Sequence, residues 1–162
     1  MQGIIDSHFH IWAPSVQPLS WLNGTDGSIT RRYDMGYLER AYDSCAKRHP
    51  EHGIRFIGGV YVEVDTDDTE LEDRLLSENH DPLLLATSMR SAVGPAMRVP
   101  LYAHGVRESL HTPSSPQGRC LQEDFIRGLR LMTEKTCRST RACVSASYPI
   151  SPRRANGFPK RP

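Results

Sequence analysis

The sequence has 162 residues, of which 24% are charged and 38% are hydrophobic, a composition typical of a globular domain with its own core. No hydrophobic run approaches the ~20 residues of a membrane-spanning helix, and the amino terminus lacks a secretory pattern, so we expect a cytoplasmic protein with no membrane partner. The four cysteines include no Cys-x-x-Cys pair, which predicts reduced thiols.

The net charge of +1 averages two unlike segments. Residues 1–132 contain 13 basic and 18 acidic residues, whereas residues 133–162 contain 7 basic residues, one acidic residue and four prolines. The basic segment carries no nucleic-acid-binding motif and no interleaved aromatic pattern. We therefore predict a folded segment over 1–132, a disordered or frameshifted tail over 133–162, and no nucleic-acid partner.

The predicted elements begin with a strand over residues 3–11 and a long loop over 13–33. Asp34 is a suitable N-cap for a helix over 35–48, in which Leu38, Ala41, Tyr42 and Cys45 follow helical spacing. A second strand follows over Ile54–Val64. Asp67 and Glu70 resemble a capping box that opens a second helix ending near Asn79.

Leu83–Met89 is predicted as a third strand and Tyr102–Arg107 as a fourth, followed by a loop over 111–119. Leu121, Phe125, Leu129 and Met132 then form the stripe of another helix, and a weak fifth strand is predicted over Arg141–Ser147. This alternation of strands and helices predicts an α/β fold built from parallel βα units.

The predicted first strand contains the strongest candidates for functional side chains. Strand side chains alternate, so we predict one polar face and one packing face, made by Asp6, His8 and His10 and by Ile5, Phe9 and Ile11 respectively. Two imidazoles two residues apart on a rigid strand are suited to bind a divalent metal ion from one side.

Three further candidates lie near the ends of predicted strands, where the functional groups of parallel α/β barrels gather. Glu63 and Arg107 are candidates for contacts with a substrate, and His111 follows Arg107 by four residues. Each has a structural alternative: Glu63 as an exposed strand residue, Arg107 in an ion pair with Glu63 or Glu108, and His111, like His104, as a solvated loop residue.

The segment Asp6-Ser7-His8-Phe9-His10-Ile11-Trp12 resembles the opening of the amidohydrolase superfamily. The tryptophan at the end of this segment favours a resemblance to the amidohydrolase-related (amidohydrolase 2) branch. That branch includes L-fuconolactone, L-rhamnonolactone and dicarboxylate lactonases. Val62-Glu63-Val64, Gly105-Val106-Arg107 and Asp124–Leu129 are similar to later segments of that branch, in the same order. The similarity extends from about residue 3 to about residue 132.

The resemblance implies a hydrolase that adds water to a lactone or ester carbonyl, with a small-molecule substrate. In metal-containing members, His8 and His10 would be two ligands of a divalent ion such as zinc, although some lactonases of this branch work without metal. Glu63 and Arg107 would help to position the substrate. His111 is added as a further substrate-binding candidate because of its place after the fourth strand, not because of the resemblance. The implied fold is the N-terminal half of a (β/α)8 TIM-type barrel, with about four to five parallel strands and flanking helices.

The family's later histidine and its catalytic aspartate on the eighth strand have no match in this sequence, so no catalytic residue is assigned. We therefore expect a truncated chain of impaired activity, with open sheet edges that promote self-association. Two alternatives remain: a barrel phosphoesterase or metal-dependent nuclease, which can also open with His-x-His, and a non-catalytic fragment that pairs with another chain.

Overall fold

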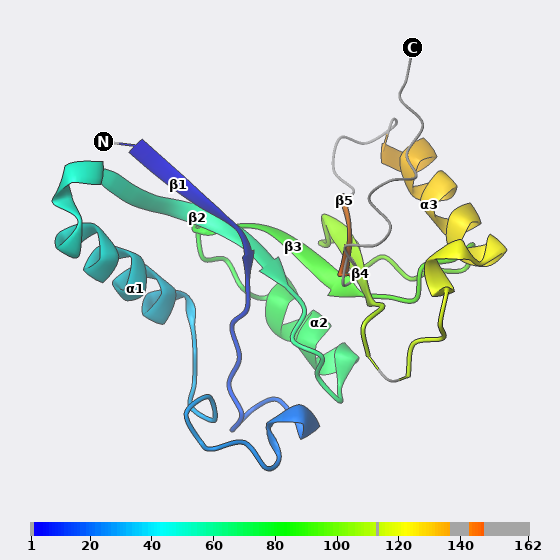
Figure 1. Ribbon diagram of the computed structural model, residues 1–162, viewed down its shortest axis with the longest axis horizontal. Coiled ribbons are helices and arrows are strands. Elements are labelled where there is room, and N and C mark those ends of the chain that lie inside the picture. Colours follow the sequence, from blue (N-terminus) through cyan, green and yellow to red (C-terminus); the bar gives the residue numbers. More distant parts are fainter. Residues whose placement is uncertain (1, 113, 137–142, 148–162) are drawn as a thin grey trace.

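The computed structural model describes residues 2–112, 114–136 and 143–147, with side chains described up to residue 133. Its sheet has five parallel strands in the order of the chain, and the sheet curls around one side (Figure 1). The strands are β1 (Gln2–Phe9), β2 (Ile54–Val62), β3 (Leu84–Arg90), β4 (Gly105–Ser109) and β5 (Cys143–Ser147). The predicted partial α/β barrel is therefore confirmed.

Among the described residues, three α-helices flank the sheet: α1 (Met35–Arg48), α2 (Thr69–Ser77) and α3 (Glu123–Thr136). Short 3-10 turns occupy Ser20–Leu22, Pro50–His52 and Arg119–Leu121. Because the strand order increases steadily, right-handed crossovers bring the helices to the same face of the sheet. The opposite face is the concave side, which corresponds to the interior of a closed barrel.

The ends of the helices follow from local chemistry. Asp34 caps α1 as predicted, because its carboxylate accepts the Tyr37 N–H at 2.9 Å. The predicted cap of α2 was one residue off: Asp68 accepts the Leu71 N–H, also at 2.9 Å. Asp67 instead accepts hydrogen bonds from the backbone and hydroxyl of Ser20, which tie the long loop to the end of β2.

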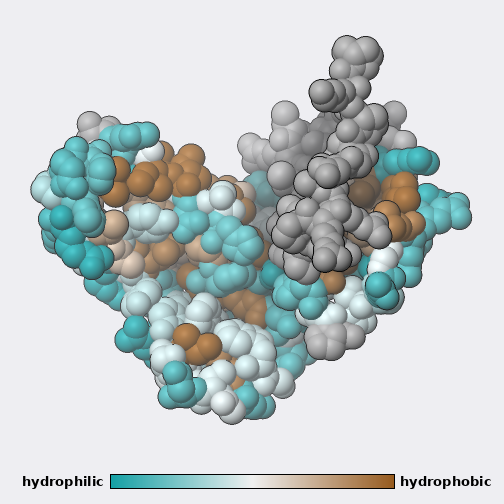
Figure 2. Space-filling model, viewed as in Figure 1, coloured by the Kyte–Doolittle hydropathy of each residue, from teal (hydrophilic) through white to brown (hydrophobic). Residues whose placement is uncertain are grey.

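Two hydrophobic clusters pack the helices onto the sheet. The first joins β1, β2 and β3 to α1 and α2, with Phe9, Tyr61 and Met89 at its centre. The second joins β4 to α3 around Val106 and Phe125. Figure 2 shows that hydrophobic surface remains exposed over the amino-terminal strands, where Ile5 of the edge strand β1 is 55% exposed.

The predicted strand over 102–107 begins later than expected, at Gly105, because a turn from Pro100 to Ala103 and the Tyr102–Asp73 hydrogen bond occupy the preceding residues. Cys45 and Cys120 are free thiols, as predicted. The predicted disorder of the tail falls mainly on residues 148–162, which lie outside the described residues. Within the described ranges, no helix has the length and apolar character needed to cross a bilayer.

Candidate active site

The two histidines of the first strand converge at its carboxyl end. His8 Nε2 lies 3.2 Å from His10 Nε2, and the two rings meet edge to face at 75°. His10 Nδ1 donates a hydrogen bond of 2.8 Å to the Val62 carbonyl, which fixes the ring and leaves the Nε2 lone pair directed toward His8. The predicted pairing of these two side chains on one face is therefore observed.

The geometry of the pair suits a shared ion. Two nitrogens bound at ~2.0–2.1 Å to one tetrahedral zinc ion lie about 3.3–3.4 Å apart. The observed 3.2 Å is close to that separation. Burial lowers the pKa of His8, and the neighbouring His10 and Arg107 lower it further, which favours the neutral imidazole that binds metal. Among the described residues, no third ligating side chain completes this pair.

Glu63 and Arg107 form a buried ion pair across β3. Arg107 Nη1 lies 2.6 Å from Glu63 Oε1, and the side chains are 12% and 1% exposed. The second carboxylate oxygen of Glu63 accepts the Asp65 N–H at 2.8 Å. Both oxygens of Glu63 are thus engaged, whereas Arg107 Nε is a buried donor without a partner among the described residues. Of these two side chains, Arg107 is the one with a donor, Nε, that is available for a further hydrogen bond.

Arg107 and Glu63 act on His8 through their charges. Arg107 lowers the pKa of His8, whereas Asp6 and, to a lesser extent, Glu63 raise it, so both members of the ion pair lie within electrostatic reach of His8. His111 is different: it is exposed in the loop after β4, and no contact among the described residues joins it to the other four predicted site residues. His104 is not a freely solvated loop residue, because its Nδ1 accepts the Thr87 N–H.

Asp6 does not share the face of the histidines, contrary to the prediction. Between Asp6 and Phe9, β1 advances three residues while β2 advances two, from Gly59 to Tyr61, so β1 contains a β-bulge. Asp6 consequently lies toward the helices, where Tyr42 of α1 donates a hydrogen bond of 2.9 Å to it. Burial and this hydrogen bond raise the pKa of Tyr42 to about 12.

Sequence reasoning missed a second ion pair at the same end of the sheet. Arg90 Nη1, at the end of β3, lies 2.6 Å from Asp65 Oδ1, and both side chains are about half exposed. Asp65 adopts a left-handed backbone with φ of 52°, which is uncommon for a residue other than glycine. The pair borders a pocket of about 390 Å³ that also contains hydroxyl groups, from Ser91, Ser109 and Thr112.

Asp65 was not recognised as a candidate from the sequence, because it lies in an acidic run that precedes a helix. Carboxylates in such a position are commonly explained by their favourable interaction with the helix dipole. The sequence offered one signal: Arg90 and Asp65 each follow a predicted strand, and the carboxyl ends of parallel strands meet at one edge.

A search of solved structures found a similar chain, "Amidohydrolase 2 from Bifidobacterium longum subsp. infantis". The similarity has 47% sequence identity and a TM-score of 0.68, and covers 83% of the present chain. It covers 49% of the Bifidobacterium chain, so the present sequence spans about half the length of that protein. No protein-family model and no curated protein matched.

Proposed function

We propose that this chain contributes the two histidines, His8 and His10, of a hydrolase active site. The similarity to the Bifidobacterium protein places the chain in the amidohydrolase superfamily. The observation that carries the proposal is the pair of imidazole Nε2 atoms 3.2 Å apart at the carboxyl end of β1. This is the end of a barrel strand at which TIM-type enzymes hold their reacting groups.

His8 and His10 would hold a divalent ion, with zinc as the first candidate. When bound, the ion would polarise a carbonyl oxygen or acidify a bound water. The Val62 carbonyl would orient His10 toward the ion. Burial lowers the pKa of His8, with smaller contributions from His10 and Arg107, which favours its neutral, ligating form. Arg107 Nε has no hydrogen-bond partner among the described residues, which supports a role for Arg107 in orienting a substrate oxygen. Glu63 holds the guanidinium in position.

The proposed substrate is a small lactone or ester. Water adds to the carbonyl carbon, the ring C–O bond breaks, and the leaving oxygen takes up a proton to give a hydroxy acid. The hydroxyl groups and Arg90 in the neighbouring pocket are suited to a polyhydroxylated or carboxylated substrate, which favours sugar lactones within this class.

The described carboxylates beside the histidines are already engaged. Glu63 is paired with Arg107, Asp6 accepts from Tyr42, and Asp65 is paired with Arg90. We therefore propose that the general base comes from outside the described residues. Because the chain spans about half of its structural relative, hydrolysis is proposed for the assembled enzyme, to which this chain would contribute a partial barrel.

The exposed edge strand β1 supports a related proposal. Its outer backbone groups pair with no strand among the described residues, and such edges promote pairing with another chain. A non-catalytic fragment that pairs through this edge, either with itself or with a complementary half barrel, is the alternative to an enzyme.

The test is hydrolysis of γ- and δ-lactones of sugars, monitored as acid release with and without added Zn²⁺. The purified full chain is assayed alone and after mixing with the half of the Bifidobacterium protein that it does not cover. We expect activity from the mixture that His8→Asn/His10→Asn abolishes and that the exposed control His80→Asn preserves. Activity of the mixture against phosphodiesters and not lactones would favour a phosphoesterase. A mixture that is inactive against both classes would favour the non-catalytic alternative.

A further inference from the structure

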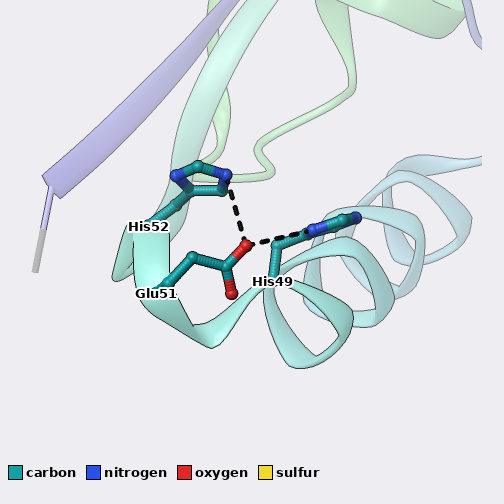
Figure 3. Close-up of side chains that lie close together, drawn as sticks. All are labelled: His49, Glu51 and His52. Carbon is teal, nitrogen blue, oxygen red and sulfur yellow. Dashed lines mark hydrogen bonds and ion pairs between the residues drawn. The ribbon is translucent and has the colours of Figure 1, made fainter.

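We propose that His49, Glu51 and His52 form a second site for a divalent transition-metal ion. The three residues occupy the short connection between α1 and β2, and their side chains turn toward one another (Figure 3). Glu51 Oε1 lies 3.3 Å from His49 Nδ1 and 3.5 Å from His52 Nε2. One ligand atom from each residue lies within 4.8 Å of the others.

These separations are near those of a coordinated ion. Nitrogen and oxygen ligands at ~2.0–2.2 Å from a tetrahedral metal lie about 3.3–3.6 Å from one another. The two contacts of Glu51 already have this length. The ligand nitrogens of His49 and His52 lie within 4.8 Å of each other, so an ion would draw these two nitrogens together. All three side chains are more than half exposed, which leaves coordination positions open to water.

The backbone of this connection is well fixed. His49 N–H donates to the Cys45 carbonyl at 3.1 Å, which joins the segment to the last turn of α1. Gly53 has φ of 53° and donates to the Pro50 carbonyl, and its own carbonyl accepts from Gln2 of β1 at 2.7 Å. A ligand set held in this way loses little conformational entropy when it binds an ion.

The charges and the donor set define the kind of ion. The carboxyl end of α1 carries the negative end of the helix dipole, which favours a cation. Lys47 and Arg48 oppose a cation, but Arg48 Nε donates back along the helix to the Ser44 carbonyl at 3.3 Å. Two imidazoles with one carboxylate suit Zn²⁺, Co²⁺, Ni²⁺ or Cu²⁺ and are poorly matched to Mg²⁺ or Ca²⁺.

This site lies at the opposite end of the sheet from the His8–His10 pair. The connection precedes Ile54, which is paired with Gln2, whereas His10 contacts Val62 at the far end of β2. Ile54 and Val62 are eight residue steps apart along β2, a distance of roughly 26 Å. The two sites would therefore bind ions independently, and this inference does not rest on the proposed hydrolase function.

The test is calorimetric titration of the full chain with Zn²⁺, starting from the His8→Asn/His10→Asn background so that only the second site contributes. We expect this background to bind Zn²⁺, and its affinity to fall at least tenfold when His49→Asn/His52→Asn is added. His80→Asn, which changes another exposed histidine, should leave the affinity unchanged.

A second measurement guards against misfolding of the background. In the otherwise unchanged chain, His49→Asn/His52→Asn should lower the amount of bound Zn²⁺ by one ion per chain. Far-UV circular dichroism should stay constant, because these side chains are exposed. Cu²⁺ at this site should display coupling to two imidazole nitrogens in its electron paramagnetic resonance spectrum. Unchanged Zn²⁺ affinity and stoichiometry in the His49→Asn/His52→Asn variants would overturn the proposal.

Discussion

Arg107 and Glu63 are 44 residues apart in the chain, yet their side chains meet at 2.6 Å. Glu63 directly follows β2 and Arg107 lies in β4, so the pair bridges the intervening strand β3. Since Glu63 is almost fully buried, Arg107 is the cation that compensates its charge.

Arg107→Met should therefore destabilise the protein by about 3–5 kcal/mol, because it leaves a buried carboxylate without its partner. Urea unfolding at pH 7 measures the effect. Glu63→Gln/Arg107→Met is the matched control, and it should recover much of the loss since no buried charge remains. A loss below about 1 kcal/mol in the single variant would mean that Glu63 is compensated by another group.

Glu72 should stabilise the fold through hydrogen bonds. Its Oε1 accepts from Tyr61 Oη at 2.6 Å and from the Val64 N–H at 3.0 Å, in a buried position. Glu72→Ala should cost about 2–4 kcal/mol, because two buried donors lose their acceptor. Glu72→Gln keeps an acceptor oxygen, so its cost in thermal unfolding should be much smaller.

The difference between wild type and Glu72→Gln should depend on pH. Burial raises the pKa of Glu72 above its ordinary value of 4.5. The folded state then binds the proton more tightly than the unfolded state, so the contribution of Glu72 to stability is greatest below the unfolded pKa and falls as pH rises through the folded pKa. Wild type should therefore lose stability relative to Glu72→Gln over this interval, and an opposite slope would contradict the assigned environment.

Two helical glycines should respond in opposite ways to alanine. A Cβ at Gly128 of α3 would lie 2.5 Å from the backbone nitrogen of Gly94, so Gly128→Ala should destabilise by about 1–3 kcal/mol through overpacking. A Cβ at Gly36 of α1 meets the flexible end of Arg40 at 3.2 Å. Gly36→Ala should be neutral or stabilising by up to about 1 kcal/mol, and equal effects in thermal unfolding would refute the close approach of α3 to Gly94.

The left-handed backbone of Asp65 gives a further prediction. Asp65→Ala and Asp65→Gly both remove the ion pair with Arg90, but only glycine adopts φ of 52° without a Cβ penalty. Asp65→Ala should therefore be less stable than Asp65→Gly by about 1–2 kcal/mol in urea unfolding. Equal stabilities would indicate that the backbone relaxes to a negative φ in the alanine variant.

The sequence by itself determined the features that depend on neighbouring residues. The helix over 35–48 and its Asp34 cap were predictable, because helical spacing and the capping hydrogen bond act within a few residues. The order of strands and helices predicted the parallel sheet, because an alternation of strands and helices along the chain is typical of parallel βα units. The convergence of His8 and His10 also followed from their spacing on one strand.

Tertiary structure decided what depends on the register between strands. The β-bulge in β1 turned Asp6 toward Tyr42, an outcome that the alternation of the sequence could not reveal because a bulge is set by pairing with β2. Whether Arg107 met Glu63 or Glu108 was likewise open until the strands were assembled. Local periodicity specifies which side chains an element presents, but only the assembled sheet determines which charges lie within a few ångströms of each other.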